Sequence, residues 1–454
     1  MDRMNIVQIV SDTFRRDHLG CYGNDRIHTE NLDRFASQSM VFDRAYVASH
    51  PTIPNRHDLF TGRYTFIYSM WSPLPENEII LSQLLRQAGY TTMLIVDTPH
   101  MIRDAHYFDR GFDGWWWIRG QEHDRYMTNP TKDSTERREA FGTQYLQNVS
   151  SRRFEEDYFV AQTMTSATKW LELNYDQHEK FFLHVDAFDP HEPWDPPKWY
   201  ADMYNPDWKG GDVAGGAYVL GVNRPATSDL AEDELDRLRA LYAGEVTMVD
   251  RWVGKLLQKI EDLGLFENTA VIFTTDHGTY LGEHGYVGKR DRLYEEVAHI
   301  PLMVRMPDSE GSLRGRCGAI VQTPDLMPTI LELAEAPCPR TVQGKSMLPL
   351  IKGKEAPESR TAISSPSLVG RMLPSWITVT SKVWALLAAR IDPSARIESE
   401  LYNLSEDPSE TKNLYDEEDD VAEQLHSEMV KRLRSMGAED EILNRWTEKI
   451  KTED

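Results

Sequence analysis

The chain has 454 residues and a formal net charge of −23. That length exceeds the ~250–300 residues that one hydrophobic core usually serves, so we expect a main domain and a smaller one. The acidic balance argues against nucleic acid or an anionic membrane as a partner, because binding phosphate backbones needs a basic surface. A cationic pocket for a small anionic substrate can still lie inside an acidic protein.

Cysteine content and hydropathy indicate the cellular compartment in which the protein works. The three cysteines have no metal-ligand spacing, which fits a reducing environment. No stretch reaches the ~18 consecutive apolar residues that a membrane span needs, and no basic leader or apolar signal region precedes the first predicted strand. We therefore expect a cytoplasmic protein without a membrane partner.

The first predicted element is a buried strand at 5–10, with the sequence NIVQIV. Asp12 follows it closely, and open α/β sheets bind ligands just outside the carboxyl ends of their parallel strands. Asp12 is therefore a candidate metal ligand, although a single aspartate after a strand more often caps a helix or forms a turn.

The next informative segment is TIPNR at 52–56, which is followed by TGRY at 61–64. The secondary alcohol of Thr52 can attack phosphorus once it is deprotonated on a metal ion. The planar guanidinium of Arg56 is suited to hold the nucleophile and a non-bridging oxygen, and the amide of Asn55 can donate to the same oxygen. The alternative for Arg56 is a surface salt bridge at the start of a helix. The residues at 57–60 should begin that helix, whose N-terminus favours a bound anion.

The middle of the chain adds groups that handle protons. A strand at 181–186 leads to FDPHEPWDPP at 188–197, where His191 is our first candidate for a general acid, assisted by Lys289. The alternative is that His191 only packs within a proline-rich turn. The polar segment 119–155 reads either as an insertion near the pocket rim or as a plain surface loop.

A further strand at 270–275 ends in Asp276 and His277. With Asp12 and Thr52 they supply two carboxylates, an imidazole and an alkoxide, a set that suits Zn²⁺ or Mn²⁺ best, with Ca²⁺ or Mg²⁺ as alternatives. A two-metal arrangement stays open, in which a second ion is held by Asp189, His191 and His284.

The pattern along the whole chain predicts an α/β fold. Strands near 5–10, 92–96, 181–186, 270–275 and 301–305 alternate with helical patterns, and the clearest helix spans 232–262. This alternation favours a mostly parallel sheet that is covered on both faces.

These segments together resemble the sulfatase branch of the alkaline phosphatase superfamily. TIPNR with TGRY is similar to the signature Cys/Ser-x-Pro-Ser-Arg with Thr-Gly-Arg-Tyr, and RDHLGCYG at 16–23 and ELYNLSEDP at 400–408 are similar to further family segments. The resemblance implies an α/β/α sandwich with a catalytic domain at 1–354 and a smaller C-terminal α+β subdomain at 355–454. It also implies a divalent metal ion and a small phospho- or sulfo-ester substrate, and it leaves a homo-oligomer open.

Three departures from the sulfatase pattern point to phosphorus chemistry. Thr52 stands where sulfatases carry the Cys or Ser that is oxidised to formylglycine, and threonine cannot form that aldehyde. Thr13 stands where a second aspartate is usual. The segment DTPH at 97–100 stands where sulfatases place a lysine, so we expect Asp97, Thr98 and His100 to face the substrate.

The departures resemble phosphonate monoester hydrolases, which also cleave phosphodiesters, and TIPN is similar to the Thr-Phe-Pro-Asn of nucleotide pyrophosphatase/phosphodiesterases. They predict a hydrolase of phosphodiesters or phosphonate monoesters that works through a phospho-threonine intermediate. Two alternatives stay open: a sulfuric ester hydrolase that uses unmodified Thr52, and a non-catalytic binding protein on a sulfatase scaffold.

Overall fold

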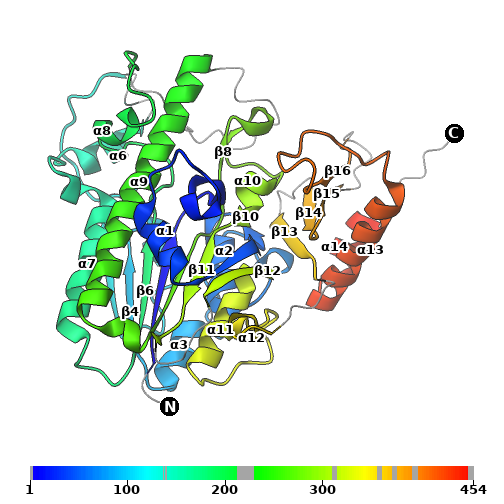
Figure 1. The fold of residues 1–454 in the computed structure, drawn as a ribbon, viewed down its shortest axis with the longest axis horizontal. Coiled ribbons are helices and arrows are strands. Elements are labelled where there is room, and N and C mark those ends of the chain that lie inside the picture. Colours follow the sequence, from blue (N-terminus) through cyan, green and yellow to red (C-terminus); the bar gives the residue numbers. More distant parts are fainter. Residues whose placement is uncertain are drawn as a thin grey trace.

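A central nine-stranded sheet runs through the molecule and a five-stranded sheet lies at its side (Figure 1). The structure is a computed structural model, and it describes residues 4–447 apart from 136–137, 139–140, 212–229, 309–313, 355–359, 371–375 and 391–396. The central strands follow the order β10 (His299–Ile300), β2 (Met40–Tyr46), β11 (Leu302–Arg305), β7 (Thr269–Thr274), β1 (Asn5–Ser11), β6 (Phe181–Ala187), β4 (Thr91–Val96) and β5 (Gly114–Trp117), and β12 (Gly315–Gln322) pairs with β2.

The core of this sheet is parallel, as the sequence pattern predicts. Strands β7, β1, β6, β4 and β5 all run in one direction. The strand expected at 301–305 forms as β11, but it runs antiparallel to β7. The chain leaves β7 at the carboxyl edge of the sheet and begins β11 at that same edge. Within this connection, all of which the structure describes, no helix carries the chain back to the opposite edge, so β11 runs antiparallel to β7.

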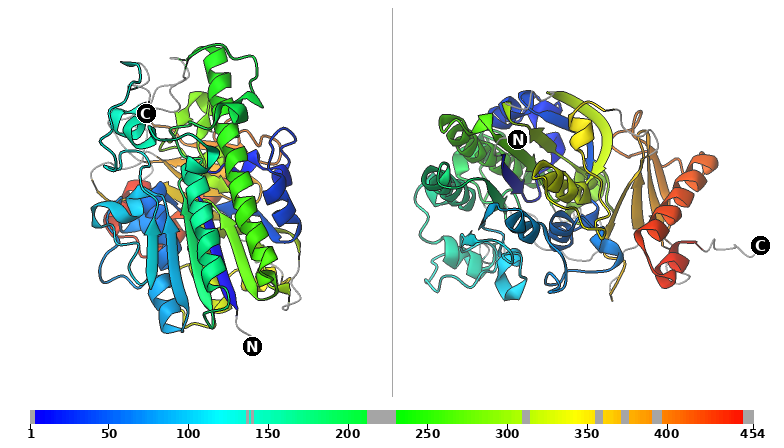
Figure 2. Two further views of the ribbon diagram at one scale, coloured as in Figure 1. Left: turned by 90° about the vertical axis from the view of Figure 1, so that its left-hand side faces the viewer. Right: turned by 90° about the horizontal axis from the view of Figure 1, so that it is seen from below.

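Helices cover both faces of the central sheet, which makes the α/β/α sandwich that the pattern predicts (Figure 2). Val7 and Ile9 of β1 pack with one helical layer, whereas Ile6 and Val10 pack with the other, because successive residues of a strand point to opposite faces. The first layer contains α1 (Glu30–Ser37), α7 (Phe159–Asn174) and α9 (Glu232–Asp262), and the second contains α2 (Thr52–Thr61), α3 (Leu81–Gln87), α11 (Leu326–Leu333) and α12 (Leu348–Ile351).

The smaller sheet is built mainly from the C-terminal part of the chain. Its order is β16 (Glu400–Asn403), β15 (Trp384–Ala389), β14 (Trp376–Thr380), β13 (Ala362–Pro366) and β3 (Ser49–His50), and α13 (Asp419–Met436) and α14 (Asp440–Thr447) pack against it (Figure 2). Strand β3 belongs to the N-terminal part and ends two residues before Thr52. The division at 354/355 remains our proposal, and residue 355 lies outside the described residues.

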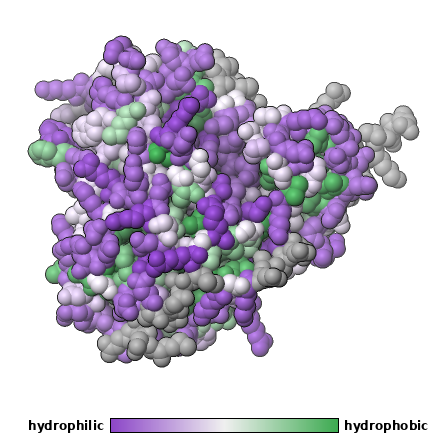
Figure 3. All heavy atoms as spheres, viewed as in Figure 1, coloured by the Kyte–Doolittle hydropathy of each residue, from purple (hydrophilic) through white to green (hydrophobic). Residues whose placement is uncertain are grey.

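Charged and polar residues cover most of the face seen in Figure 3, as a charged content of 27% leads one to expect. None of the helices in the described ranges combines the length and the low polarity that crossing a bilayer requires. The described part of segment 119–155 contains α6 (Thr143–Val149) and touches the site region, since the Gln121 amide donates to Asp189 over 2.8 Å.

Candidate active site

Three carboxylates meet at the carboxyl edge of the central sheet because of strand register. Val10 of β1 lies opposite Asp186 of β6 and opposite Thr274 of β7. Asp12 and Asp276 each follow these paired positions by two residues, so they leave the sheet at the same level. All three carboxylates are fully buried.

Asp12, Asp276 and His277 form a group suited to one metal ion. They offer ligand atoms that all lie within 4.8 Å of one another. Thr13 braces the pair of carboxylates, since its backbone N–H donates to Asp276 over 3.0 Å and its hydroxyl donates to Asp12 over 2.7 Å. The structure thus brings together three of the four ligands that the sequence suggests.

Thr52, the fourth suggested ligand, is the first residue of α2, and its Oγ1 lies 3.4 Å from His277 Nε2. Its side chain is buried and faces the ligand group, so the hydroxyl stands at a helix N-terminus where negative charge is favoured. Gly62 ends α2 with a φ of 65°, which lets the chain turn into the TGRY segment without the strain that a side chain would bring.

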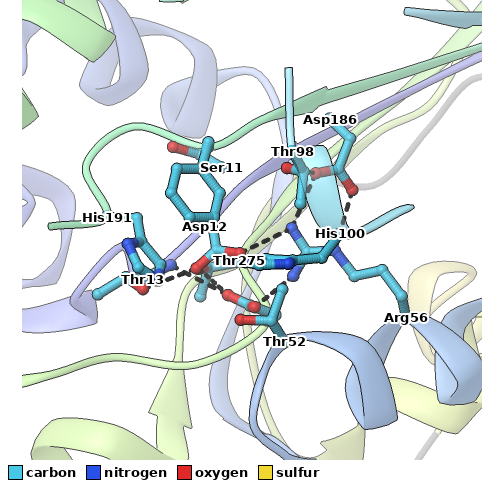
Figure 4. A network of polar contacts seen from close by, with 12 residues as sticks. Ser11, Asp12, Thr13, Thr52, Arg56, Thr98, His100, Asp186, His191 and Thr275 are labelled. Atoms are coloured by element: carbon cyan, nitrogen blue, oxygen red, sulfur yellow. Dashed lines mark hydrogen bonds and ion pairs between the residues drawn. The ribbon is translucent and has the colours of Figure 1, made fainter. Parts of the chain in front are cut away.

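Arg56 is engaged differently from the sequence expectation. Its guanidinium binds both oxygens of Asp186, at 2.8 and 3.0 Å, and approaches Asp12 at 3.2 Å (Figure 4). It also contacts Asp276. The fork is therefore occupied by carboxylates and is not free to hold a substrate oxygen. Burial would raise the pKa of Asp186 and of Asp276, but the charge of Arg56 outweighs it and holds both pKa values below their usual range.

Charge balance shows that the residues fit a divalent ion. Three buried carboxylates face one guanidinium, which leaves two negative charges uncompensated if all are ionised. Burial and the charge of the neighbouring Asp276 raise the pKa of Asp12, because a second negative charge is unfavourable at this buried position. The Oδ2 atoms of Asp12 and Asp276 are buried and face the Arg56 guanidinium, whose single positive charge does not balance three carboxylates. A divalent cation between these atoms would neutralise the surplus and complete their coordination.

Asn55 is also engaged by other parts of the fold. Its amide nitrogen donates to the backbone oxygen of Ser49 and to the Thr323 hydroxyl, each over 3.3 Å. The amide nitrogen thus ties α2 to β3 through Ser49 and to the turn Thr323–Asp325, and the side chain is fully buried. In this structure tertiary contacts hold the amide nitrogen, and binding of a substrate oxygen by Asn55 stays a prediction.

His191, Lys289 and Glu192 form a proton-handling group beside the ligand set. His191 Nδ1 lies 2.5 Å from the backbone oxygen of Glu192, which can only accept, so Nδ1 carries the hydrogen and Nε2 accepts from Lys289 over 2.7 Å. Burial lowers the pKa of His191 to about 4, which makes its imidazole neutral near pH 7. Lys289 therefore holds the transferable proton, and His191 orients it together with the Glu192 carboxylate at 3.0 Å.

Two of the three residues expected to face the substrate in the segment 97–100 are buried. Asp97 is fully buried and accepts from the Phe188 backbone over 2.6 Å, and Thr98 donates to Asp186 over 2.7 Å. Both are buried and brace neighbouring strand ends in this structure, and their contact with the substrate stays a prediction. His100 is partly exposed, at 17% of its side chain, and it pairs with Glu122 at 2.5 Å.

The suggested second-metal set does not assemble. Asp189 accepts from Gln121 and, over 3.1 Å, from the Val160 backbone at the start of α7. His284 lies instead with Glu296 and Glu410. Among the described residues, no ligand group combines Asp189, His191 and His284, because their side chains leave the backbone toward different neighbours.

Two residues near the ligands were not singled out from the sequence. Asp186 carries the signal that marked Asp12, a carboxylate at the end of a buried parallel strand, and it holds Arg56. The buried His50 ring packs edge-on against His277 with centroids 4.7 Å apart, and burial lowers its pKa. No local motif marks His50, since its place beside His277 depends on the packing of β3.

Known families and relatives resemble this chain over most of its length. The sulfatase family model matches residues 4–336, and the model for the C-terminal region of N-sulphoglucosamine sulphohydrolase matches residues 282–439. The uncharacterised sulfatase YidJ of Escherichia coli strain K12 is 27% identical over 92% of this chain and 84% of its own. An arylsulfatase of Clostridium perfringens strain 13 is 26% identical over 91% of each chain.

Among solved structures, a phosphonate monoester hydrolase of Agrobacterium radiobacter superimposes with a TM-score of 0.76. The superposition covers 95% of this chain and 96% of that one, at 20% sequence identity. At this identity the likeness shows the fold.

Proposed function

The chain belongs to the sulfatase family, and we propose that it is a metal-dependent hydrolase of phosphodiesters or phosphonate monoesters that uses Thr52 as an unmodified nucleophile. The observation that carries the proposal is the hydroxyl of Thr52, buried at the start of α2 and 3.4 Å from His277 Nε2. A threonine at this place can attack a phosphorus centre but cannot become the aldehyde on which sulfatases rely.

Charge in the pocket supports a singly charged substrate group. Arg56 is bound to carboxylates, and Lys289 is paired with Glu192 at 3.0 Å. Little positive charge from these two residues is left to bind a phosphate dianion, whereas diesters and phosphonate monoesters transfer a group with a single negative charge. The balance does not depend on Asp97, which is fully buried.

The residues suggest a two-step displacement. Asp12, Thr52, Asp276 and His277 would hold the ion, which when bound supplies a Lewis acid that lowers the pKa of a coordinated hydroxyl. Thr52 loses its proton to solvent and forms a bond to phosphorus, while the bond from phosphorus to the leaving oxygen breaks and Lys289 gives that oxygen a proton.

Water then cleaves the phospho-threonine. Its oxygen bonds to phosphorus, one of its protons returns to Lys289, and the Thr52 oxygen regains a proton from solvent. His191 accepts from Lys289 throughout and keeps the ammonium group aimed at the leaving oxygen. A cytoplasmic location completes the proposal, supported by the three unpaired cysteines.

The test is a matched panel of aryl esters, assayed with added Mn²⁺ or Zn²⁺: a bis-aryl phosphate, an aryl methylphosphonate, an aryl phosphate and an aryl sulfate. We expect kcat/KM to be highest for the first two. The names of relatives such as the arylsulfatase favour a second candidate, a sulfuric ester hydrolase that uses Thr52. A higher kcat/KM for the sulfate would overturn our assignment in its favour.

The remaining alternative function, a binding protein without catalysis, is tested by the same panel of esters. Thr52→Ala serves as the blank, because it removes the attacking oxygen and leaves most of the buried site in place. Turnover that is absent from the parent for every ester of the panel would favour a non-catalytic role.

A further inference from the structure

A second group of metal-binding side chains lies where the main body of the molecule meets the smaller sheet. His284, Glu296 and Glu410 offer ligand atoms that all lie within 4.8 Å of one another. His284 is in the turn Glu283–Gly285, Glu296 is in α10 (Glu295–Ala298), and Glu410 follows β16. Figure 1 shows α10 between the central sheet and the strands of the smaller sheet.

Each of the three side chains has one buried atom that makes no hydrogen bond. These atoms are Nε2 of His284, Oε2 of Glu296 and Oε1 of Glu410, and the Glu410 residue is only 2% exposed. His284 Nε2 lies 3.5 Å from Glu296 Oε2, which is long for a hydrogen bond. A tetrahedral ion with ligands at ~2.1 Å holds them ~3.4 Å apart, so the spacing suits two ligands of one ion.

The geometry of two of the three side chains, His284 and Glu410, is fixed by contacts outside the group. The His284 ring stacks on Tyr294 with centroids 3.8 Å apart, and Glu410 Oε2 accepts from the Glu295 backbone over 2.7 Å. These contacts leave His284 Nε2 and Glu410 Oε1 facing the same space. The unpartnered atoms are therefore held in place by packing before any ion binds.

Other acidic side chains near this group do have cationic partners. Glu400 binds Arg292 at 2.9 Å and accepts from Tyr294 at 2.6 Å, and Glu283 binds Arg15 at 2.8 Å. No Lys or Arg partner of this kind stands beside Glu410 among the described residues. Burial and the charges of nearby acids, Glu295 foremost, raise the pKa of Glu410.

We propose that His284, Glu296 and Glu410 form a second divalent-cation site, separate from the group of Asp12, Asp276 and His277. The imidazole favours Mn²⁺ or Zn²⁺ over Ca²⁺ or Mg²⁺, which prefer oxygen ligands. The three side chains line a cavity of about 990 Å³, from which water can complete the coordination.

The site would join the C-terminal part to the loop that carries the catalytic ligands. Any side chain at position 278 would clash with the backbone oxygen of Glu296, so only glycine fits there. Helix α10 therefore packs directly on Gly278, the residue after His277. The Gly278 N–H also donates to Val297 over 2.9 Å. An ion bound to Glu296 and Glu410 therefore fastens this loop to the smaller sheet.

The test is metal stoichiometry of the full-length chain by elemental analysis. Protein stripped with EDTA is reloaded with Mn²⁺ and desalted. Glu410→Gln keeps the size of the side chain and an oxygen for the Glu295 N–H, but it removes the charge. It should bind about one ion fewer per chain than the parent, whatever the occupancy at Asp12 and Asp276. Glu398→Gln, an exposed carboxylate of the same cavity, is the matched control and should keep the parental count.

A second readout guards against loss by misfolding. Mn²⁺ should raise the melting temperature of Asp276→Asn, in which the catalytic group is impaired, and this rise should disappear when Glu410→Gln is added. If Glu410→Gln does not fold, His284→Gln takes its place in both measurements. Equal ion counts in the parent and in the folded variant would overturn the proposal.

Discussion

Replacing Arg56 by methionine tests whether the guanidinium and the metal ion together neutralise the negative charges of the buried carboxylates. Arg56 and its partners Asp12, Asp186 and Asp276 all have 0% side-chain exposure. Removing one partner of a buried ion pair costs ~3–5 kcal/mol, because the remaining charge is left uncompensated. We expect Arg56→Met to lose at least ~3–5 kcal/mol of unfolding free energy in EDTA.

The loss should shrink when the ion is present. Mn²⁺ would neutralise Asp12 and Asp276, so that Asp186 alone loses its charged partner and keeps the Thr98 hydroxyl at 2.7 Å and His184 Nε2 at 3.5 Å. The expected loss in Mn²⁺ is then ~1–3 kcal/mol, the cost of one buried group that lacks its partner. Arg56→Lys should fall between parent and methionine variant, since it keeps a charge but not the fork.

The assay is urea unfolding at pH 7, followed by tryptophan fluorescence, in EDTA and in Mn²⁺. Arg316→Met is the matched control, because Arg316 pairs with Asp43 at the surface with 48% of its side chain exposed. Exposed pairs contribute ~1 kcal/mol or less, with no dependence on the ion. A loss for Arg56→Met as small as that of the control, or equal in EDTA and Mn²⁺, would refute the reasoning.

Three further outcomes are expected. Thr52→Ala should abolish nearly all turnover of the best substrate while Thr52→Ser keeps part of it, and an undiminished rate in Thr52→Ala would exclude the covalent route. Lys289→Met should lower kcat by ~10²–10⁴ for esters of poorly acidic alcohols and much less for 4-nitrophenyl esters, which need no proton; equal losses would contradict proton donation by Lys289. Burial lowers the pKa of His57 from 6.5 to about 4. Native His57 is therefore neutral while the unfolded chain is protonated between these values, so stability should fall by up to ~3 kcal/mol as pH drops from about 6.5 to 4. His57→Gln should flatten this decline in urea titrations, and an unchanged slope would show that His57 does not cause it.

Several parts of the fold and the site were predictable because their signals are local. The strands that carry Asp12 and Asp276 are short apolar runs, and a carboxylate after such a run marks the ligand edge of a parallel sheet. Helix α9 spans 232–262 as its periodicity predicts. Asp186 was within reach of the same signal, since it lies at the end of β6.

Other parts depended on neighbours distant in sequence. Asn55 has the chemistry to bind a substrate oxygen, but Thr323, 268 residues away, takes its amide hydrogen. Strand β11 reads like its parallel neighbours yet runs antiparallel, because strand direction depends on the path of the connection and not on composition.

Motifs and strand ends are set by residues adjacent in the chain, so the amino-acid sequence predicts which groups can do chemistry and at which edge of the sheet they gather. How those groups are used depends on contacts between distant segments. Arg56 meets Asp186 across 130 positions, and His284 turns to Glu296 and Glu410 instead of to Asp189. The physical reason is that a buried polar side chain takes the partners that packing brings within hydrogen-bond distance, and the linear order of residues does not specify them.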